Sequence, residues 1–129
     1  MSKFTDQLRK GFAAGRKLRV FLAGLRTAVA GDLSVMIQMS LSLVVLSVSI
    51  WLREWVDVLL IIIVTGYMLS AEIFNTVIET ICDYLQPNHD ARIGAIKDMA
   101  AAATGLSILV WTITLLFEVW RLWLALQQN

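Results

Sequence analysis

The chain has 129 residues, of which 58% are hydrophobic, and its mean hydropathy is +0.72. It is too apolar for a soluble domain of this size, which indicates a membrane protein. The formal net charge is only +1, so the distribution of charge along the chain is more informative than its sum. The single cysteine, Cys82, excludes an intramolecular disulfide and a thiol-based metal motif, and we interpret it as a small buried apolar residue.

Residues 1–31 are predicted to form a basic amphipathic surface helix. Phe4, Leu8 and Phe12 recur every four residues, and seven of the eleven basic residues of the chain lie in this segment. Such a helix lies in the membrane interface, with its basic side chains on anionic headgroups. Nucleic-acid binding is the rival interpretation. It is disfavoured because few aromatic residues lie among the basic ones and a membrane segment follows directly.

Three apolar segments follow, at residues 33–52, 58–82 and about 99–120. The first has twenty uncharged residues, which at about 1.5 Å of helical rise each cover a hydrocarbon core of ~30 Å. It begins too late and is too long for a cleaved signal peptide. We therefore predict an all-α membrane protein with three transmembrane helices and the N-terminal surface helix, in one domain over residues 1–129.

The basic residues also predict the orientation of the chain. They concentrate before the first span and in the second loop, Tyr84 to Ile96, which contains the only proline, Pro87. By the positive-inside rule these parts are cytoplasmic, while the first loop, Leu52 to Asp57, and the C-terminus lie outside. Trp111, within the third span, is interpreted as a packing residue. Four other tryptophans fall at the predicted outer interface, as indole rings commonly do: Trp51, Trp55, Trp120 and Trp123.

The second span is unusual because its cytoplasmic half carries an acidic stripe, Glu72, Asn75, Glu79 and Asp83. On a helix these four side chains fall within an arc of roughly 80°. Carboxylates at membrane depth cost about 2.5–3.5 kcal/mol each on insertion scales, so they usually face a bundle interior, a partner or a metal. A polar seam between helices of an oligomer is one reading. A functional site is the other.

The chemistry open to this stripe is limited but specific. Paired carboxylates with other oxygen ligands suit Mg²⁺, a carboxylate in apolar surroundings can act as a base, and a nearby lysine can meet a phosphate. Lys97, Asp98 and Asp32 are expected in the same cytoplasmic layer. Asp32 also fits the N-cap of the first span. The sequence has no phosphate-binding glycine loop and no protein-kinase signature, so residue chemistry alone demands no nucleotide.

A longer pattern carries a family resemblance. Glu72-x-x-Asn75-Thr76-x-Ile78-Glu79-x-x-x-Asp83, followed by Lys97-Asp98-Met99-Ala100-Ala101, resembles the signature of the prokaryotic integral-membrane diacylglycerol kinases, which include the undecaprenol kinases. The resemblance covers nearly the whole chain.

The resemblance implies a small homotrimeric lipid kinase that uses MgATP at the cytoplasmic face of the inner membrane. Glu72 would be the general base, Glu79 would hold Mg²⁺, and Asn75 would lie near the metal and phosphates. Lys97 would contact the phosphates. The residues expected to seat the nucleotide are Asp83, Asp98 and, in a loop that matches only loosely, Asn88 and His89.

Two departures from the family pattern concern the segment before the first span. Asp32 stands where a metal-binding glutamate is usual, and Gln38 stands where a further glutamate is common. Diacylglycerol, giving phosphatidic acid, is the first expected substrate, and undecaprenol is the alternative. A non-enzymatic protein, either a proton-conducting bundle or a packing subunit, is the rival from another class.

Overall fold

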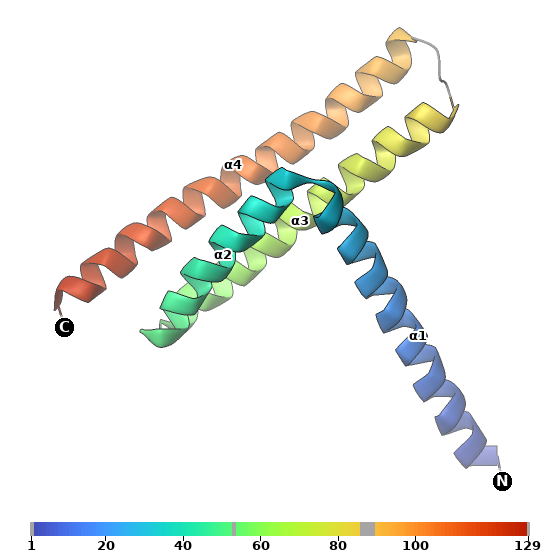
Figure 1. Ribbon diagram of the computed structural model, residues 1–129, viewed down its shortest axis with the longest axis horizontal. Helices are drawn as coiled ribbons and strands as arrows, with labels where there is room; N and C mark the ends of the chain where they lie inside the picture. The colour runs from blue at the N-terminus through green and yellow to red at the C-terminus, as the bar shows by residue number, and fades with distance from the viewer. Residues whose placement is uncertain (1, 53, 86–89, 129) are drawn as a thin grey trace. The chain divides into compact units, whose positions relative to one another are not determined.

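The computed structural model describes residues 2–52, 54–85 and 90–128, and these form four helices (Figure 1). They are α1 (Ser2–Gly31), α2 (Leu33–Trp51), α3 (Trp55–Leu85) and α4 (Ala91–Gln128). None of the described residues lies in a strand. Because α2, α3 and α4 are each long and apolar enough to cross a membrane, the predicted all-α fold with three spans is confirmed.

The chain divides into two compact units, Met1–Leu33 and Ser34–Asn129. The first unit is essentially α1, which runs without a break through Gly15 and ends at Gly31. Asp32 is the non-helical residue between α1 and α2, so the predicted break at this point is confirmed. Apolar side chains such as Leu18 and Phe21 are exposed within this unit, as expected of a helix whose apolar face rests on lipid.

The second unit packs α2, α3 and α4 through positions spaced three or four residues apart, the spacing of one helix face. The apolar core combines Val45 of α2 with side chains of α3 and α4: Ile61, Met68, Trp111, Leu115 and Leu122. Polar residues share the same faces and are buried with them: Gln38, Ser42, Ser49, Asp57, Glu72, Thr104, Ser107 and Glu118. Polar groups inside a membrane bundle hold helices together or build a site.

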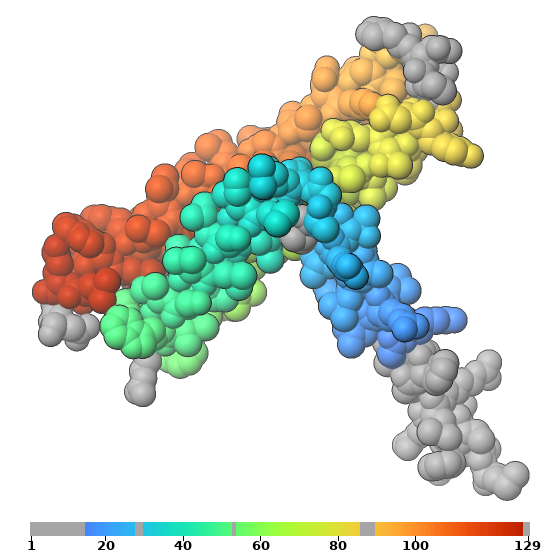
Figure 2. All heavy atoms as spheres, in the orientation of Figure 1, coloured from blue at the N-terminus to red at the C-terminus, as the bar shows by residue number. Residues whose placement is uncertain are grey.

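A hydrogen-bonded hub joins the three long helices near the middle of the second unit. Ser42 Oγ of α2 accepts a hydrogen bond from Thr65 Oγ1 of α3 at 2.9 Å and another from Trp111 Nε1 of α4 at 2.9 Å. Trp111 is 5% exposed, which confirms that it is a packing residue. Figure 2 shows α2 (cyan to green) and α4 (orange to red) side by side.

The predicted loop boundaries were wrong, because the helices extend past the apolar segments. α3 begins at Trp55 rather than at residue 58, and α4 begins at Ala91, inside the loop expected over Tyr84 to Ile96. Backbone hydrogen bonds continue a helix through polar residues when its end is capped. At α4 the cap is Asp90, whose Oδ1 accepts from Arg92 N at 2.8 Å.

Among the described residues, two ion pairs link α3 to α4, one near each end of α3. Asp57 Oδ1 and Arg121 Nη1 are 2.6 Å apart at the end where α3 begins. Asp83 Oδ1 and Lys97 Nζ are 2.5 Å apart at the end where α3 finishes. The four tryptophans assigned to the outer interface are exposed and belong to the Asp57 end of their helices. Cys82 is free and buried, as predicted.

Candidate functional site

The acidic stripe of α3 is a continuation of its buried apolar face. Ile61 and Met68 are 1% and 0% exposed, and Glu72 follows Met68 by one helical turn with 9% exposed. Asn75 and Glu79 are half-buried, and Asp83 is exposed. The stripe therefore runs from the bundle interior at Glu72 outward to the end of the helix.

Asn75 and Glu79 form one oxygen-rich unit. Asn75 Nδ2 donates a hydrogen bond to Glu79 Oε1 at 3.0 Å, one turn further along the same helix. The other end of this amide, Asn75 Oδ1, is buried and has no hydrogen-bond partner among the described residues. The amide thus orients the Glu79 carboxylate and keeps its own oxygen available for a further partner.

Glu72 is held on a stretch of α3 that is fixed by neighbouring hydroxyl groups. Thr76 Oγ1 donates to the Glu72 carbonyl at 3.0 Å. Thr104 Oγ1 of α4 donates to the Ala71 carbonyl at 3.2 Å, one residue before Glu72. This second bond joins α4 to the α3 backbone beside the candidate base, so it positions the two helices relative to each other at this point.

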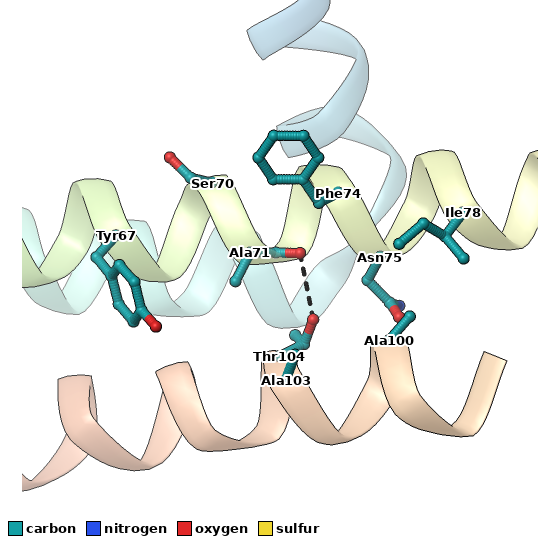
Figure 3. Close-up of a pocket in the computed structure, with 9 residues that line it drawn as sticks. All are labelled: Tyr67, Ser70, Ala71, Phe74, Asn75, Ile78, Ala100, Ala103 and Thr104. Atoms are coloured by element: carbon teal, nitrogen blue, oxygen red, sulfur yellow. Dashed lines mark hydrogen bonds between the residues drawn. The ribbon is translucent and has the colours of Figure 1, made fainter. Parts of the chain in front are cut away.

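A hollow of about 280 Å³ lies between α3 and α4 next to these residues (Figure 3). Ala100 and Ala103 form its α4 wall, and their small side chains leave the hollow open on that side. In Figure 3 the Asn75 amide points across toward Ala100. Tyr67, Ser70, Ala71, Phe74, Ile78 and Thr104 complete the lining, which is mostly apolar.

Lys97 extends the site from α4. Its pairing with Asp83 brings a cation to the end of the acidic stripe, and the hydrogen bond to that carboxylate raises the pKa of Lys97 above its ordinary value. The ammonium group is therefore charged at neutral pH, and it has two further N–H donors for a phosphate. Asp98, the next residue, is exposed.

The remaining candidate residues lie elsewhere in the chain. Asp32 belongs to the first unit, where it is exposed and occupies the N-cap position of α2. Asn88 and His89 lie outside the described residues. The structure adds Thr104, which sequence reasoning missed. A threonine among alanines gives little signal, because its bond to Ala71 depends on how two helices pack.

A metal ion at this site would need oxygen ligands from these side chains. Within residues 2–52, 54–85 and 90–128 no group of three or more His, Cys, Asp or Glu side chains is arranged for a metal. Mg²⁺, however, is commonly held by one or two protein oxygens together with water and phosphate oxygens. Glu79 and the unpartnered Asn75 Oδ1 fit that donor set.

A multi-pass helical bundle with a buried carboxylate on one of its helices and an apolar hollow lined by an amide is suited to a membrane enzyme that acts on an amphipathic substrate. The sequence model of the prokaryotic diacylglycerol kinase family matches residues 19–118, and the chain belongs to that family. Comparisons with curated proteins and with solved structures gave no match. The family resemblance of the α3 motif is thereby confirmed, and the chain is a multi-pass membrane protein of the lipid-kinase type.

Proposed function

We propose that this protein transfers the γ-phosphoryl group of ATP to the hydroxyl of a membrane lipid, with diacylglycerol as the first choice and undecaprenol as the alternative. One observation carries the proposal. Within the family-matched range, a buried carboxylate, Glu72, lies one turn from the hydrogen-bonded Asn75–Glu79 unit. The candidate base and the metal-binding oxygen pair therefore lie on consecutive turns of α3, and Asn75 also lines the apolar hollow.

In this proposal Glu72 is the general base. It accepts the proton of the lipid hydroxyl while that oxygen forms a bond to the γ-phosphorus, and the bond from the γ-phosphorus to the ADP oxygen breaks. Phosphoryl transfer depends mainly on an in-line arrangement and on neutralising the phosphate oxygens. A buried carboxylate can accept a proton from a hydroxyl held above acyl chains without competition from bulk water.

The other residues would bind and orient the nucleotide. Glu79 and Asn75 Oδ1 would hold Mg²⁺, which supplies charge neutralisation at the phosphates when bound. Lys97 would keep its bond to Asp83 and direct its remaining donors at the phosphates. Asp83, Asp98, Asn88 and His89 would contact the nucleotide, and Asp32 would add a second carboxylate to the metal.

We further propose a homotrimer in the inner membrane, with the N-terminus in the cytoplasm and the C-terminus outside. Three spans leave little room for a separate nucleotide domain, so a site shared between protomers is the economical arrangement. Many large apolar side chains of α2, α3 and α4 are exposed in the single chain, including Leu43, Ile62 and Leu116. They are available for both lipid and neighbouring protomers.

The substrate is tested by incubating the purified protein with γ-labelled ATP and Mg²⁺ in mixed micelles. Diacylglycerol and undecaprenol are presented in separate reactions, and micelles without lipid are the control. Label in one lipid identifies the substrate. No label in either lipid, from an oligomer shown to be intact, would contradict the proposal and favour the non-enzymatic packing or proton-conducting reading.

A further inference from the structure

A second buried acidic cluster lies at the other end of the bundle, away from the candidate kinase site. It combines Asp57, two residues into α3, with Glu118 and Arg121, which lie one turn apart on α4. Asp57 is 1% exposed and Glu118 is 0% exposed. Arg121 also lies beyond the family-matched residues 19–118. None of the roles assigned above uses this cluster.

The hydrogen bonds of this cluster are incomplete. Arg121 Nη1 donates to Asp57 Oδ1 at 2.6 Å. Asp57 Oδ2 and both carboxylate oxygens of Glu118 are buried, and none has a hydrogen-bond partner among the described residues. Buried oxygens in this state cost free energy, because desolvation of each is not repaid.

Glu118 lies one turn before Arg121 on α4, and Arg121 is hydrogen-bonded to Asp57 of α3. The Glu118 carboxyl interacts electrostatically with both Asp57 and Arg121. Two ionised carboxylates cannot hydrogen-bond to each other, because both can only accept. A single proton on either of them turns this contact into an O–H···O⁻ bond, which is short and strong.

The charges of the cluster lead to the same conclusion. Two carboxylates and one guanidinium would leave one uncompensated negative charge inside an apolar bundle, which is costly. α2, which packs against α3 and α4, contributes none: Leu33–Trp51 contains no titratable side chain. One proton makes the cluster of Asp57, Glu118 and Arg121 neutral.

We propose that Asp57 and Glu118 form a proton-binding site that holds one proton per chain, shared between the two carboxyl groups and anchored by Arg121. Glu118 carries the proton and donates it to Asp57 Oδ2, while Asp57 Oδ1 accepts from Arg121. A metal ion is the less suitable ligand, because Arg121 already neutralises one of the two carboxyls.

The proton would set how strongly α3 and α4 hold together at this end. When it leaves to water, two like charges face each other and the contact between the helices weakens. At neutral pH the folded chain holds this proton, whereas the unfolded chain, with both carboxyls exposed to water, has already released it. Stability from this site is therefore present at low and neutral pH and is lost as pH rises through its titration.

Infrared spectroscopy of the full-length protein in lipid tests the proposal directly. The wild type should show the C=O stretching band of a protonated carboxylic acid at neutral pH, and the band should shift in D₂O and disappear at alkaline pH.

Glu118→Gln should lack this band, because Asp57 then pairs with Arg121 alone. Glu54→Gln, which removes another carboxylate near the start of α3, is the matched control and should keep it. A wild type without the band, or a band unchanged in Glu118→Gln, overturns the proposal.

A second measurement separates a proton from a metal ion and does not depend on one variant folding. The thermal midpoint of the wild type is measured against pH, and at fixed pH against Na⁺ and Ca²⁺. We expect the midpoint to fall with rising pH and not to respond to either cation, and we expect Glu118→Gln and Asp57→Asn each to flatten the pH response. A midpoint that depends on a cation, or on neither variable, contradicts a shared proton. Neither measurement requires kinase activity, so a failure of the proton-binding proposal is distinguishable from a failure of the proposed function.

Discussion

At the residue scale, two buried glutamates lie in opposite halves of the bundle and have different neighbouring residues. Glu72 of α3 lies one turn from Asn75, which lines the apolar hollow, whereas Glu118 of α4 lies one turn from Arg121, which pairs with Asp57. A base needs a site where a substrate can reach it, while a proton held between two carboxyls needs a closed one. The surroundings, rather than the residue type, separate the two roles.

Asp32 allows a metal ligand to be told apart from a helix cap. It occupies the N-cap position of α2, and asparagine caps a helix about as well as aspartate. If Asp32 also binds Mg²⁺, Asp32→Asn should raise the Mg²⁺ concentration needed for half-maximal kinase activity by about tenfold or more. The thermal midpoint should change little. An unchanged Mg²⁺ titration would remove Asp32 from the metal site.

The Lys97–Asp83 pair makes a prediction about pH. The hydrogen bond that Lys97 donates to Asp83 raises the pKa of Lys97, so the stabilisation from the pair is fully present at neutral pH and is lost only as pH rises through the pKa of Lys97 in the folded chain. Asp83→Asn should lower the pKa of Lys97 toward its ordinary value, as measured by NMR titration of the side-chain ammonium. Asp98→Asn is the control. If the pKa of Lys97 were the same in Asp83→Asn as in the wild type, the ion pair with Asp83 would not be what raises it.

At the scale of helices, Ser42 is the point where α2, α3 and α4 are joined. Ser42→Ala leaves Trp111 Nε1 and Thr65 Oγ1 without their acceptor. We expect a loss of about 1–2 kcal/mol in the free energy of unfolding, since hydrogen bonds between membrane helices are worth amounts of this order.

Ser40 provides the control for this experiment on the same helix. Its hydroxyl is exposed and donates a hydrogen bond to the Met36 carbonyl within α2 itself. Ser40→Ala should therefore leave the unfolding free energy nearly unchanged. Both free energies of unfolding are measured in mixed micelles. An equal loss in Ser42→Ala and Ser40→Ala would mean that the hydrogen bonds of Ser42 to α3 and α4 do not stabilise the bundle.

The helices also show what the sequence alone can predict. Hydropathy located all three spans, and helical spacing placed Glu72, Asn75 and Glu79 on the inward face of α3. Hydropathy missed the polar ends of the helices, such as residues 91–96, because a capped helix continues through polar residues. It also missed contacts between distant residues, such as Trp111 with Ser42 and Asp57 with Arg121, because these depend on how the helices pack.

At the scale of the whole molecule, the orientation in the membrane follows from charge and aromatic residues. Basic residues gather in the N-terminal segment, and exposed tryptophans gather at the Asp57 end of the bundle. This pattern predicts a cytoplasmic N-terminus and an outer C-terminus.

The orientation can be tested with single cysteines, because the chain has only Cys82 and it is buried. In a Cys82→Ala background, Gln127→Cys should react with a membrane-impermeant maleimide added to intact spheroplasts. Lys17→Cys should react only after the membrane is opened. The reverse labelling pattern would invert the assignment and place the acidic end of α3 outside, where no ATP is supplied.

The central claim is that the acidic end of α3, and not acidic groups in the bundle generally, performs the chemistry. The most direct measurement is transfer of labelled phosphate to the accepted lipid by the wild type, Glu72→Gln and Glu118→Gln, each shown to keep the oligomer of the wild type. Glu72→Gln should lower kcat by about 10²–10⁴-fold, the usual contribution of a general base. Glu118→Gln should stay within about twofold of the wild type at neutral pH, since its amide replaces the donated proton. Full activity in Glu72→Gln, or an equal loss in both variants, would contradict the account.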